Sequence, residues 1–99
     1  MSSSEIRLRE PRALAVRIHA ESLTIDLVDG RTVIVPLGWF RRLWYGTADE
    51  RGAVEVLGDR EYLHWPELDE DLSVPDIVAG RRSGESQSSL KKWLETRES

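Results

Sequence analysis

The chain has 99 residues, of which 39% are hydrophobic and 32% are charged, and it contains no cysteine. One small globular domain fits this length, and the hydrophobic fraction is too high for a disordered chain. Without cysteine there are no disulfides and no thiolate metal sites. No apolar run approaches the roughly 18 to 20 residues of a membrane span, and residues 1–4 lack the apolar core of a signal peptide. We therefore expect a soluble, cytoplasmic protein without membrane attachment.

The net charge of −4 is concentrated in the second half of the sequence. Residues 1–45 hold seven arginines and five acids, whereas residues 46–99 hold seven basic and thirteen acidic residues. Nucleic-acid affinity depends largely on neutralising phosphates, so this balance disfavours direct DNA binding. A DNA-binding regulator stays open as an alternative only through one basic cluster, which consists of Arg7, Arg9, Arg12, Arg41 and Arg42.

Residues 1–12 are polar and predict a flexible N-terminus. Two runs of alternating apolar and polar residues follow, and Asp29-Gly30 then marks a two-residue hairpin into a third run. A period of two is typical of strands with one buried face, and tight hairpin turns favour Asp-Gly. We therefore predict a three-stranded antiparallel meander. Its core-facing residues are expected to be Leu14, Val16, Ile18, Leu23, Ile25, Leu27, Val33 and Val35.

After Pro36 the apolar spacing changes to three and four residues. This spacing predicts one short amphipathic helix packed on the sheet. Its apolar residues are Leu37, Phe40, Leu43 and Trp44. Gly46 is expected to end this helix in the left-handed conformation. Three of the four tryptophans are expected in the core or at its edge, namely Trp39, Trp44 and Trp65.

Two further helix starts lie downstream. Residues 47–50 (Thr-Ala-Asp-Glu) form a capping box, which predicts a short helix as far as about Arg51. Residues 73–76 (Ser-Val-Pro-Asp) begin another short helix, and Gly80 is placed to close it.

Residues 54–57 and 61–65 are typical of two more short strands, joined by a turn at Gly58-Asp59. The expected fold class is therefore α+β, with a small antiparallel sheet of a three-stranded meander plus two short strands, packed by short helices. We expect this single domain to cover residues 13–80.

Residues 81–89 are rich in serine, glycine and charge and predict a linker. A short C-terminal helix or tail over residues 90–99 should follow, with Leu90, Trp93 and Leu94 as its apolar stripe. Such a short helix is marginal alone in water, so it must dock on its own domain, a second copy or a partner, or else fray. Its other faces are expected to carry Lys91, Lys92, Glu95 and Arg97.

The run from Tyr62 to Asp71 combines aromatic residues, one histidine and three consecutive acids. A metal-binding site or metal-dependent enzyme at His64 and Asp69, Glu70 and Asp71 is one interpretation, but adjacent carboxylates diverge and calcium loops space their ligands differently. We favour instead that the acids stabilise the N-terminal dipole of the helix that begins at Ser73. The sequence contains no nucleophile–histidine motif and no glycine-rich phosphate loop, so we expect neither an enzyme nor a cofactor.

Four segments in order, residues 27–31, 36–43, 47–51 and 64–74, resemble one known pattern, and the His-Trp-Pro and Asp-Glu-Asp portions are its most specific part. The pattern belongs to a widespread bacterial family called domain of unknown function 2442, and the resemblance covers roughly residues 13–80. Phe40 occupies a position where the family commonly has proline. The resemblance implies a small α+β fold. Some members adjoin a second small protein in what look like toxin–antitoxin pairs, and a related domain precedes a helix-turn-helix, which implies a binding or regulatory role.

We therefore expect a non-enzymatic protein-interaction or regulatory module, which could be one half of a toxin–antitoxin-like pair. Its partner is expected to be another protein or a second copy of the chain. The residues expected to bind the partner are Leu90, Trp93, Leu94, Arg41, Arg42, Asp69, Glu70 and Asp71.

Overall fold

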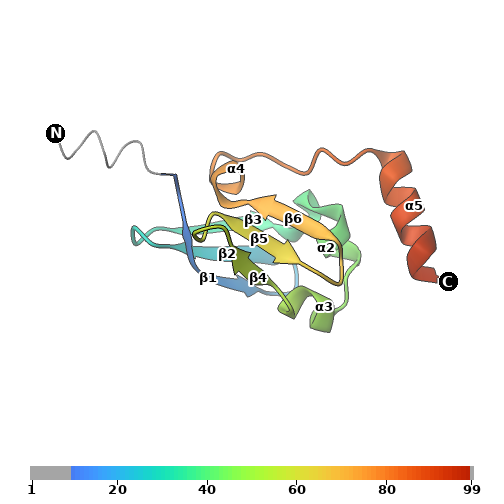
Figure 1. Cartoon of the computed structure of the whole chain (residues 1–99), viewed down its shortest axis with the longest axis horizontal. Helices are drawn as coiled ribbons and strands as arrows, with labels where there is room; N and C mark the ends of the chain where they lie inside the picture. Colours follow the sequence, from blue (N-terminus) through green and yellow to red (C-terminus); the bar gives the residue numbers. More distant parts are fainter. Residues whose placement is uncertain (1–9, 99) are drawn as a thin grey trace.

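The main body of the protein consists of two antiparallel three-stranded sheets (Figure 1). It is seen in a computed structural model that describes residues 10–98. The strands of the first sheet are, in spatial order, β1 (Ala13–Ile18), β2 (Ser22–Leu27) and β3 (Thr32–Pro36). Those of the second are β4 (Glu55–Leu57), β5 (Tyr62–Trp65) and β6 (Glu70–Ser73). Of the N-terminus predicted to be flexible, only residues 10–12 are described.

Short helical elements connect the sheets and follow the second one. The connection contains a 3₁₀ helix, η1 (Leu37–Trp39), and the helices α2 (Arg41–Tyr45) and α3 (Ala48–Gly52). The second sheet is followed by α4 (Val74–Val78) and α5 (Gln87–Glu98). The predicted α+β class is confirmed. The two short strands belong to a separate sheet, and its third strand, β6, is not predicted by the sequence pattern.

The predicted meander is confirmed in the first sheet. Leu23, Ile25 and Leu27 on the central strand are at most 2% exposed and face the core. The prediction for Leu14 is wrong, because its side chain is 60% exposed. The pairing of β1 with β2 shifts register between residues 13 and 15. Such a bulge reverses the side-chain alternation, so Ala13 is buried in place of Leu14.

The single amphipathic helix after Pro36 is wrong. Phe40 has extended backbone angles (φ −123°, ψ 95°) and separates η1 from α2. Phe40 and Leu43 are buried as predicted, whereas Trp44 is 45% exposed rather than in the core. The chain changes direction at Phe40, so helical spacing counted across this residue does not define one face.

Gly46 has an extended conformation (φ −74°, ψ 158°), so the predicted left-handed helix end is wrong. Its role is steric, because a β-carbon there would lie 2.8 Å from the Cδ1 atom of buried Leu68. The capping box that follows is confirmed. The Glu50 amide donates to the Thr47 hydroxyl at 3.1 Å, and the Thr47 amide donates to the Glu50 carboxylate at 2.8 Å.

A hairpin of β5 and β6 occupies the aromatic and acidic run. Leu63 pairs with Leu72 and Trp65 with Glu70, and Asp69 adopts a left-handed φ of 52° in the turn between the strands. The predicted interaction of Asp69–Asp71 with a helix dipole is therefore wrong, since these acids lie in a turn and a strand. The adjacent carboxylates were expected to diverge. Glu70 and Asp71 do so, because successive residues of a strand point to opposite faces of the sheet.

The helix start at Ser73 and its end at Gly80 are confirmed. The Asp76 amide donates to the Ser73 hydroxyl at 3.3 Å, and Asp76 is the acid in the first turn of α4. Gly80 has a φ of 84°, and its amide donates to the Ile77 carbonyl oxygen at 3.0 Å.

The core lies between the two sheets and draws residues from both. Trp65 is fully buried as predicted, and its Nε1 donates to the Arg51 carbonyl oxygen at 2.9 Å. Trp39 is partly buried at the core edge. The core residues are Ala13, Leu23, Ile25, Leu27, Val35, Leu37, Phe40, Leu43, Leu63, Trp65, Leu68, Leu72, Val74 and Ile77.

Helix α5 lies at one end of the molecule, beside α2 and α3, after an extended segment that leaves α4 (Figure 1). It begins at Gln87, three residues before the predicted start. The Ser89 amide donates to the Ser86 hydroxyl at 3.2 Å, which caps the first turn. No helix within residues 10–98 is long and apolar enough to cross a membrane.

Candidate interaction site around Arg42

Arg42 joins four parts of the chain. Its Nε lies 2.9 and 3.0 Å from the two carboxylate oxygens of Glu85, and its Nη2 donates to one of them at 2.5 Å. Its Nη1 donates to the Asp69 carbonyl oxygen at 2.9 Å, in the turn between β5 and β6. The guanidinium carbon also lies 5.1 Å from the centre of a Trp93 ring on α5. One side chain of α2 therefore fixes the β5–β6 turn, the segment before α5, and α5 itself.

The Arg42–Glu85 pair is sheltered from solvent, with side chains only 14% and 13% exposed. The Arg42 hydrogen bonds lower the pKa of the Glu85 carboxyl, and the same bonds raise the pKa of Arg42. Both groups are thus charged across the physiological pH range. A bidentate guanidinium–carboxylate pair fixes orientation as well as contributing energy.

A second ion pair holds the other end of α5. Arg97 donates to the two carboxylate oxygens of Glu50 on α3 at 3.1 and 2.7 Å. Hydrogen bonds from Arg97 and from the Thr47 backbone amide lower the pKa of Glu50 to about 2. The capping box of α3 therefore also serves as the docking point for the end of α5.

Trp93 lies between these two anchors. The guanidinium carbon of Arg97 is 4.7 Å from a Trp93 ring centre, and that of Arg42 is 5.1 Å away, so two cations face the indole. Leu90 is 6% exposed and is the one buried apolar residue of α5 in the described part of the helix. Trp93 packs against the edge of the core, and Leu94 is half-buried. We name the surface formed by Arg42, Glu50 and the Asp69 turn the α5-binding surface.

The segment before α5 is also attached to the domain. The Arg82 guanidinium lies 4.8 Å from a Trp39 ring centre, and the Ser83 amide donates to the Trp39 carbonyl oxygen at 3.2 Å. Together with Glu85 these contacts lead the chain along η1 and α2 to the start of α5.

Glu70 is a partly buried acid next to this surface. One of its oxygens accepts from the Asp71 amide at 3.2 Å, while Oε2 is buried without a hydrogen-bond partner among the described residues. Burial raises the pKa of Glu70 to about 7, although the Asp71 amide and the Arg42 charge oppose this effect. The nearby Glu85 and Asp71 carboxylates raise the pKa further. Glu70 is therefore the acid here whose charge changes near neutral pH.

Asp71 and His64 point to the other side of the second sheet. His64 Nδ1 lies 2.5 Å from Asp71 Oδ1, directly across the β5–β6 pair. In residues 10–98 the structure assembles no group of three histidine, cysteine or acidic side chains that could hold a metal ion. The residues proposed for a metal site are thus divided between two faces of the hairpin.

The predicted partner-binding residues are only partly brought together. Arg42, Asp69, Glu70 and Trp93 meet at or beside the α5-binding surface, and Leu90 and Leu94 lie on the same helix as Trp93. Asp71 lies on the opposite face of its strand, and Arg41 is exposed while Arg42 is enclosed. Of the basic cluster considered for DNA, Arg12 is paired with Asp59 at 3.4 Å, and Arg7 and Arg9 lie outside the described residues.

Three residues of this site were not predicted as site residues: Glu50, Glu85 and Arg97. Arg97 follows Trp93 by four positions and Leu90 by seven, so helical spacing could have placed it on the docking stripe instead of an outer face. Glu50 was identified only as a cap. Glu85 lies 43 positions from Arg42, and no local pattern connects the two.

The two sheets and the helices that join them define a small α+β protein to which a C-terminal helix is attached by ion pairs. The model of a protein family of unknown function, DUF2442, matches residues 13–83, and the chain belongs to this family. The match ends before α5 begins at Gln87.

Two solved structures are similar to this chain. One is a protein of unknown function from Rhodospirillum rubrum, with 34% sequence identity and a TM-score of 0.68, covering 81% of this chain and 96% of that one. The other is an uncharacterised protein from Chromobacterium violaceum, with 14% identity and a TM-score of 0.64, covering 92% of this chain and 82% of that one. The second likeness concerns the fold alone. No curated protein matches the chain.

Proposed function

We propose that the protein is a non-enzymatic protein-interaction module that binds an amphipathic helix at its α5-binding surface. The observation that carries this proposal is α5 itself. This helix lies outside the residues matched by the family, yet it is docked on the family domain by the Arg42–Glu85 and Glu50–Arg97 pairs. The chain thus carries an example of the ligand that the surface accepts.

The contacts define which helices would bind. An acid must reach Arg42 before the helix begins, a leucine and a tryptophan must face the domain, and an arginine four residues after the tryptophan must reach Glu50. Two ion pairs of opposite polarity, one at each end, fix the direction of the helix. Binding of an amphipathic helix in a surface groove is a common mode of peptide recognition, and charged pairs contribute mainly to its specificity.

The attachment of α5 is suited to exchange. Among the described residues of α5 only Leu90 is buried, whereas Trp93 and Leu94 are partly buried. The Glu50–Arg97 pair, with side chains 19% and 24% exposed, is open to weakening by water and salt to a greater extent than the sheltered Arg42–Glu85 pair. A helix of twelve residues gains little stability from its own backbone hydrogen bonds. A helix from a partner, or α5 of a second copy, could therefore replace it. In this proposal α5 regulates access to the surface, as expected for the partner-binding half of a bacterial two-protein pair of the toxin–antitoxin kind.

A peptide of residues 85–98 added to the chain that ends at Arg82 tests the proposal. We expect calorimetry to show one-to-one binding, which the full-length chain shows more weakly because its own α5 competes. Arg42→Ala in the shortened chain should abolish binding, whereas Arg41→Ala, at an exposed neighbouring position, should leave it intact. If the shortened chain is folded by circular dichroism and the peptide does not bind, or binds the Arg42→Ala variant equally well, the proposal is wrong.

A further inference from the structure

Strand β4 forms a free edge of the second sheet. It pairs with β5 on one side only, and no backbone hydrogen bond among the described residues joins it to β1, the neighbouring edge of the first sheet. The contact between the sheets at this side is at the turn, where the Ala13 amide donates to the Arg60 carbonyl oxygen at 2.8 Å. The backbone groups on the outer side of β4 are therefore available for pairing.

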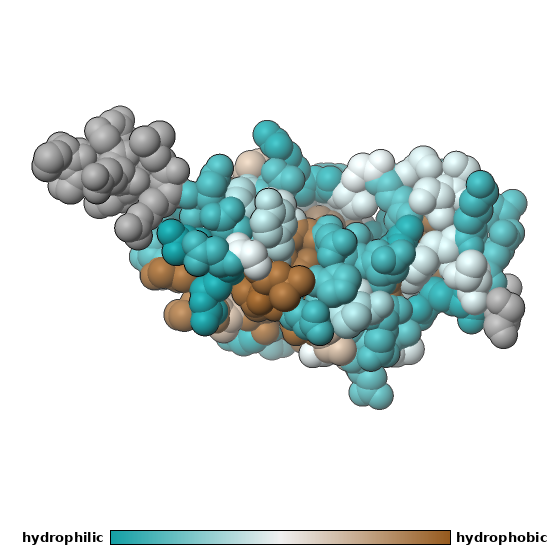
Figure 2. All heavy atoms as spheres, viewed as in Figure 1, coloured by the Kyte–Doolittle hydropathy of each residue, from teal (hydrophilic) through white to brown (hydrophobic). Residues whose placement is uncertain are grey.

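The other sheet edges carry features that discourage pairing. β1 contains a bulge, β3 ends in Pro36, and β6 lies beside residues 81–84, with which it lines a cavity. β4 has no bulge, proline or covering segment, and its protection is limited to its length of three residues and the charge of Glu55. It exposes apolar side chains on both faces instead, with Val56 37% exposed on the core side and Leu57 46% exposed on the outer side. Figure 2 shows this apolar surface in brown over β4, beside hydrophilic surface over the β5–β6 hairpin.

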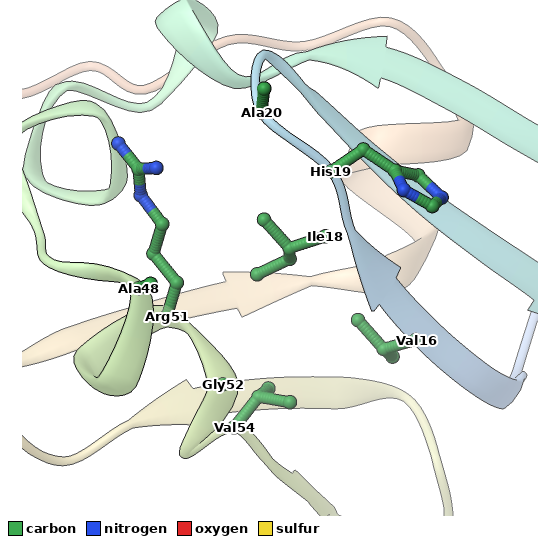
Figure 3. Close-up of a pocket in the computed structure, with 8 residues that line it drawn as sticks. All are labelled: Val16, Ile18, His19, Ala20, Ala48, Arg51, Gly52 and Val54. Atoms are coloured by element: carbon green, nitrogen blue, oxygen red, sulfur yellow. The ribbon is translucent and has the colours of Figure 1, made fainter.

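A cavity of about 250 Å³ opens next to this edge, between β1 and α3. Val16, Ile18 and Val54 point into it from its two sides, as Figure 3 shows. The Arg51 guanidinium is directed away from them and donates to the Leu43 and Trp44 carbonyl oxygens at 2.7 and 2.6 Å. The cavity has a mixed lining, with aliphatic side chains from Val16, Ile18 and Val54 and polar ones from His19 and Arg51, and its aliphatic part could take an apolar side chain from a chain paired with β4.

The outer face of the same sheet carries two acidic side chains, Glu55 and Asp71. Glu55, His64 and Asp71 lie in one row across the three strands, opposite the buried side of the sheet. Asp71 is engaged by His64, whereas Glu55 is exposed. Across a strand pair, opposite charges attract and like charges repel. A second copy paired antiparallel about Val56 would place its Leu57 opposite Glu55 and supply no cation there, so a basic partner segment fits this edge better than a second copy.

We propose that β4 binds an extended, basic segment of a partner protein by strand addition, with alternate residues apolar and basic. The apolar residues occupy the cavity beside Val54, and a lysine or arginine lies beside Glu55. In strand addition the backbone hydrogen bonds supply affinity and the alternate side chains supply specificity. This surface is separate from the α5-binding surface, and the two bind different shapes of ligand.

The full-length protein and two capped six-residue peptides test this proposal, one of alternating lysine and valine and one of alternating glutamate and valine. In amide-detected NMR, the lysine peptide at millimolar concentration should shift β4 and the residues around Val54, and slow hydrogen exchange in β4. The glutamate peptide should not. Glu55→Lys should reverse this preference, with the lysine peptide binding on the order of five- to tenfold more weakly. Glu67→Lys, which makes the same charge change at an exposed position in the turn between β5 and β6, should leave the preference unchanged.

Three results would overturn the proposal. The first is shifts confined to the α5-binding surface, which would assign the peptide to the helix site instead. The second is equal binding of both peptides to the wild-type chain. The third is association of the protein with itself through β4, seen as concentration-dependent shifts of β4 without peptide. Failure of the peptide of residues 85–98 to bind the chain that ends at Arg82 would contradict only the proposal for the α5-binding surface. The two proposals can therefore fail separately.

Discussion

The Arg42 guanidinium and the Glu85 carboxylate are joined by three short contacts, of 2.5, 2.9 and 3.0 Å, across 43 positions of sequence. Arg42 lies inside the family domain and Glu85 lies beyond its matched end. This pair is therefore the first link between the domain and the helix appended to it. Its shelter from solvent makes it stronger than an ordinary surface ion pair.

Arg42→Ala should detach α5 while leaving the domain folded. We expect it to remove about 1 to 3 kcal/mol of docking free energy, because Glu85 loses its charged partner and Trp93 loses one of its two cations. Hydrogen-exchange mass spectrometry should then show fast exchange in residues 87–98 and little change in the sheets. Arg41→Ala is the matched control. Unchanged protection of α5 in the Arg42 variant would mean that Leu90 and Trp93 alone hold the helix.

Glu70 should make the protein less stable as the pH rises. Its pKa is raised to about 7 in the folded state from an ordinary value of 4.5, so between these values the folded protein binds more protons than the unfolded chain. Stability should therefore fall as the pH rises from about 4.5 through about 7 and then level off. With allowance for solvent screening, we expect a loss of about 1 to 2 kcal/mol from this group.

Glu70→Gln should remove that dependence and stabilise the protein at alkaline pH. Urea unfolding at pH 5.5 and 8.5 measures the difference, with Glu67→Gln, at an exposed position of the turn before β6, as control. The wild-type protein and the Glu70→Gln variant could show the same change in unfolding free energy between the two pH values. That result would contradict a buried ionisable Glu70.

Local patterns predicted the elements whose signals lie within a few residues. The Asp29-Gly30 hairpin, the Thr47–Glu50 capping box and the Ser73 start of α4 depend on neighbouring groups, and all three are present. The apolar and aromatic character of residues 54–57 and 61–65 predicted two strands, and these are β4 and β5. These are features that a short segment determines before it packs.

The remaining features depend on contacts that the sequence does not display. β6 was missed because three consecutive acids are unusual in a strand; it forms because Leu72 pairs beside Leu63 and Glu70 is tolerated partly buried near Arg42. The bulge at Leu14 reverses a pattern that alternation alone would continue. The candidate site is the part that the sequence predicts least, because Arg42 and Glu85 come into contact only after the whole domain has folded.

Gly46→Ala should destabilise the domain, although its backbone angles suit alanine. A β-carbon would lie 2.8 and 3.0 Å from the two methyl carbons of Leu68, which is fully buried and has little room to move. We expect a loss of about 1 to 3 kcal/mol from this overpacking. Gly52→Ala is the control, because nothing lies within 4 Å of its β-carbon position. Thermal unfolding of both variants measures the difference, and equal melting temperatures would show that Leu68 adapts.

Truncation after Arg82 should leave the domain folded and abolish association through α5. The fourteen core residues all precede this point, and the Arg82–Trp39 contact is kept. What is lost is one buried leucine, a partly buried tryptophan and two ion pairs, set against the ordering of the segment that carries them. These contributions nearly cancel, so we expect a small change in melting temperature, with loss of any dimer or complex seen by size-exclusion chromatography of the full chain. Unfolding of the truncated chain would instead assign Trp93 to the core of the domain, and α5 would then no longer be an exchangeable binding element.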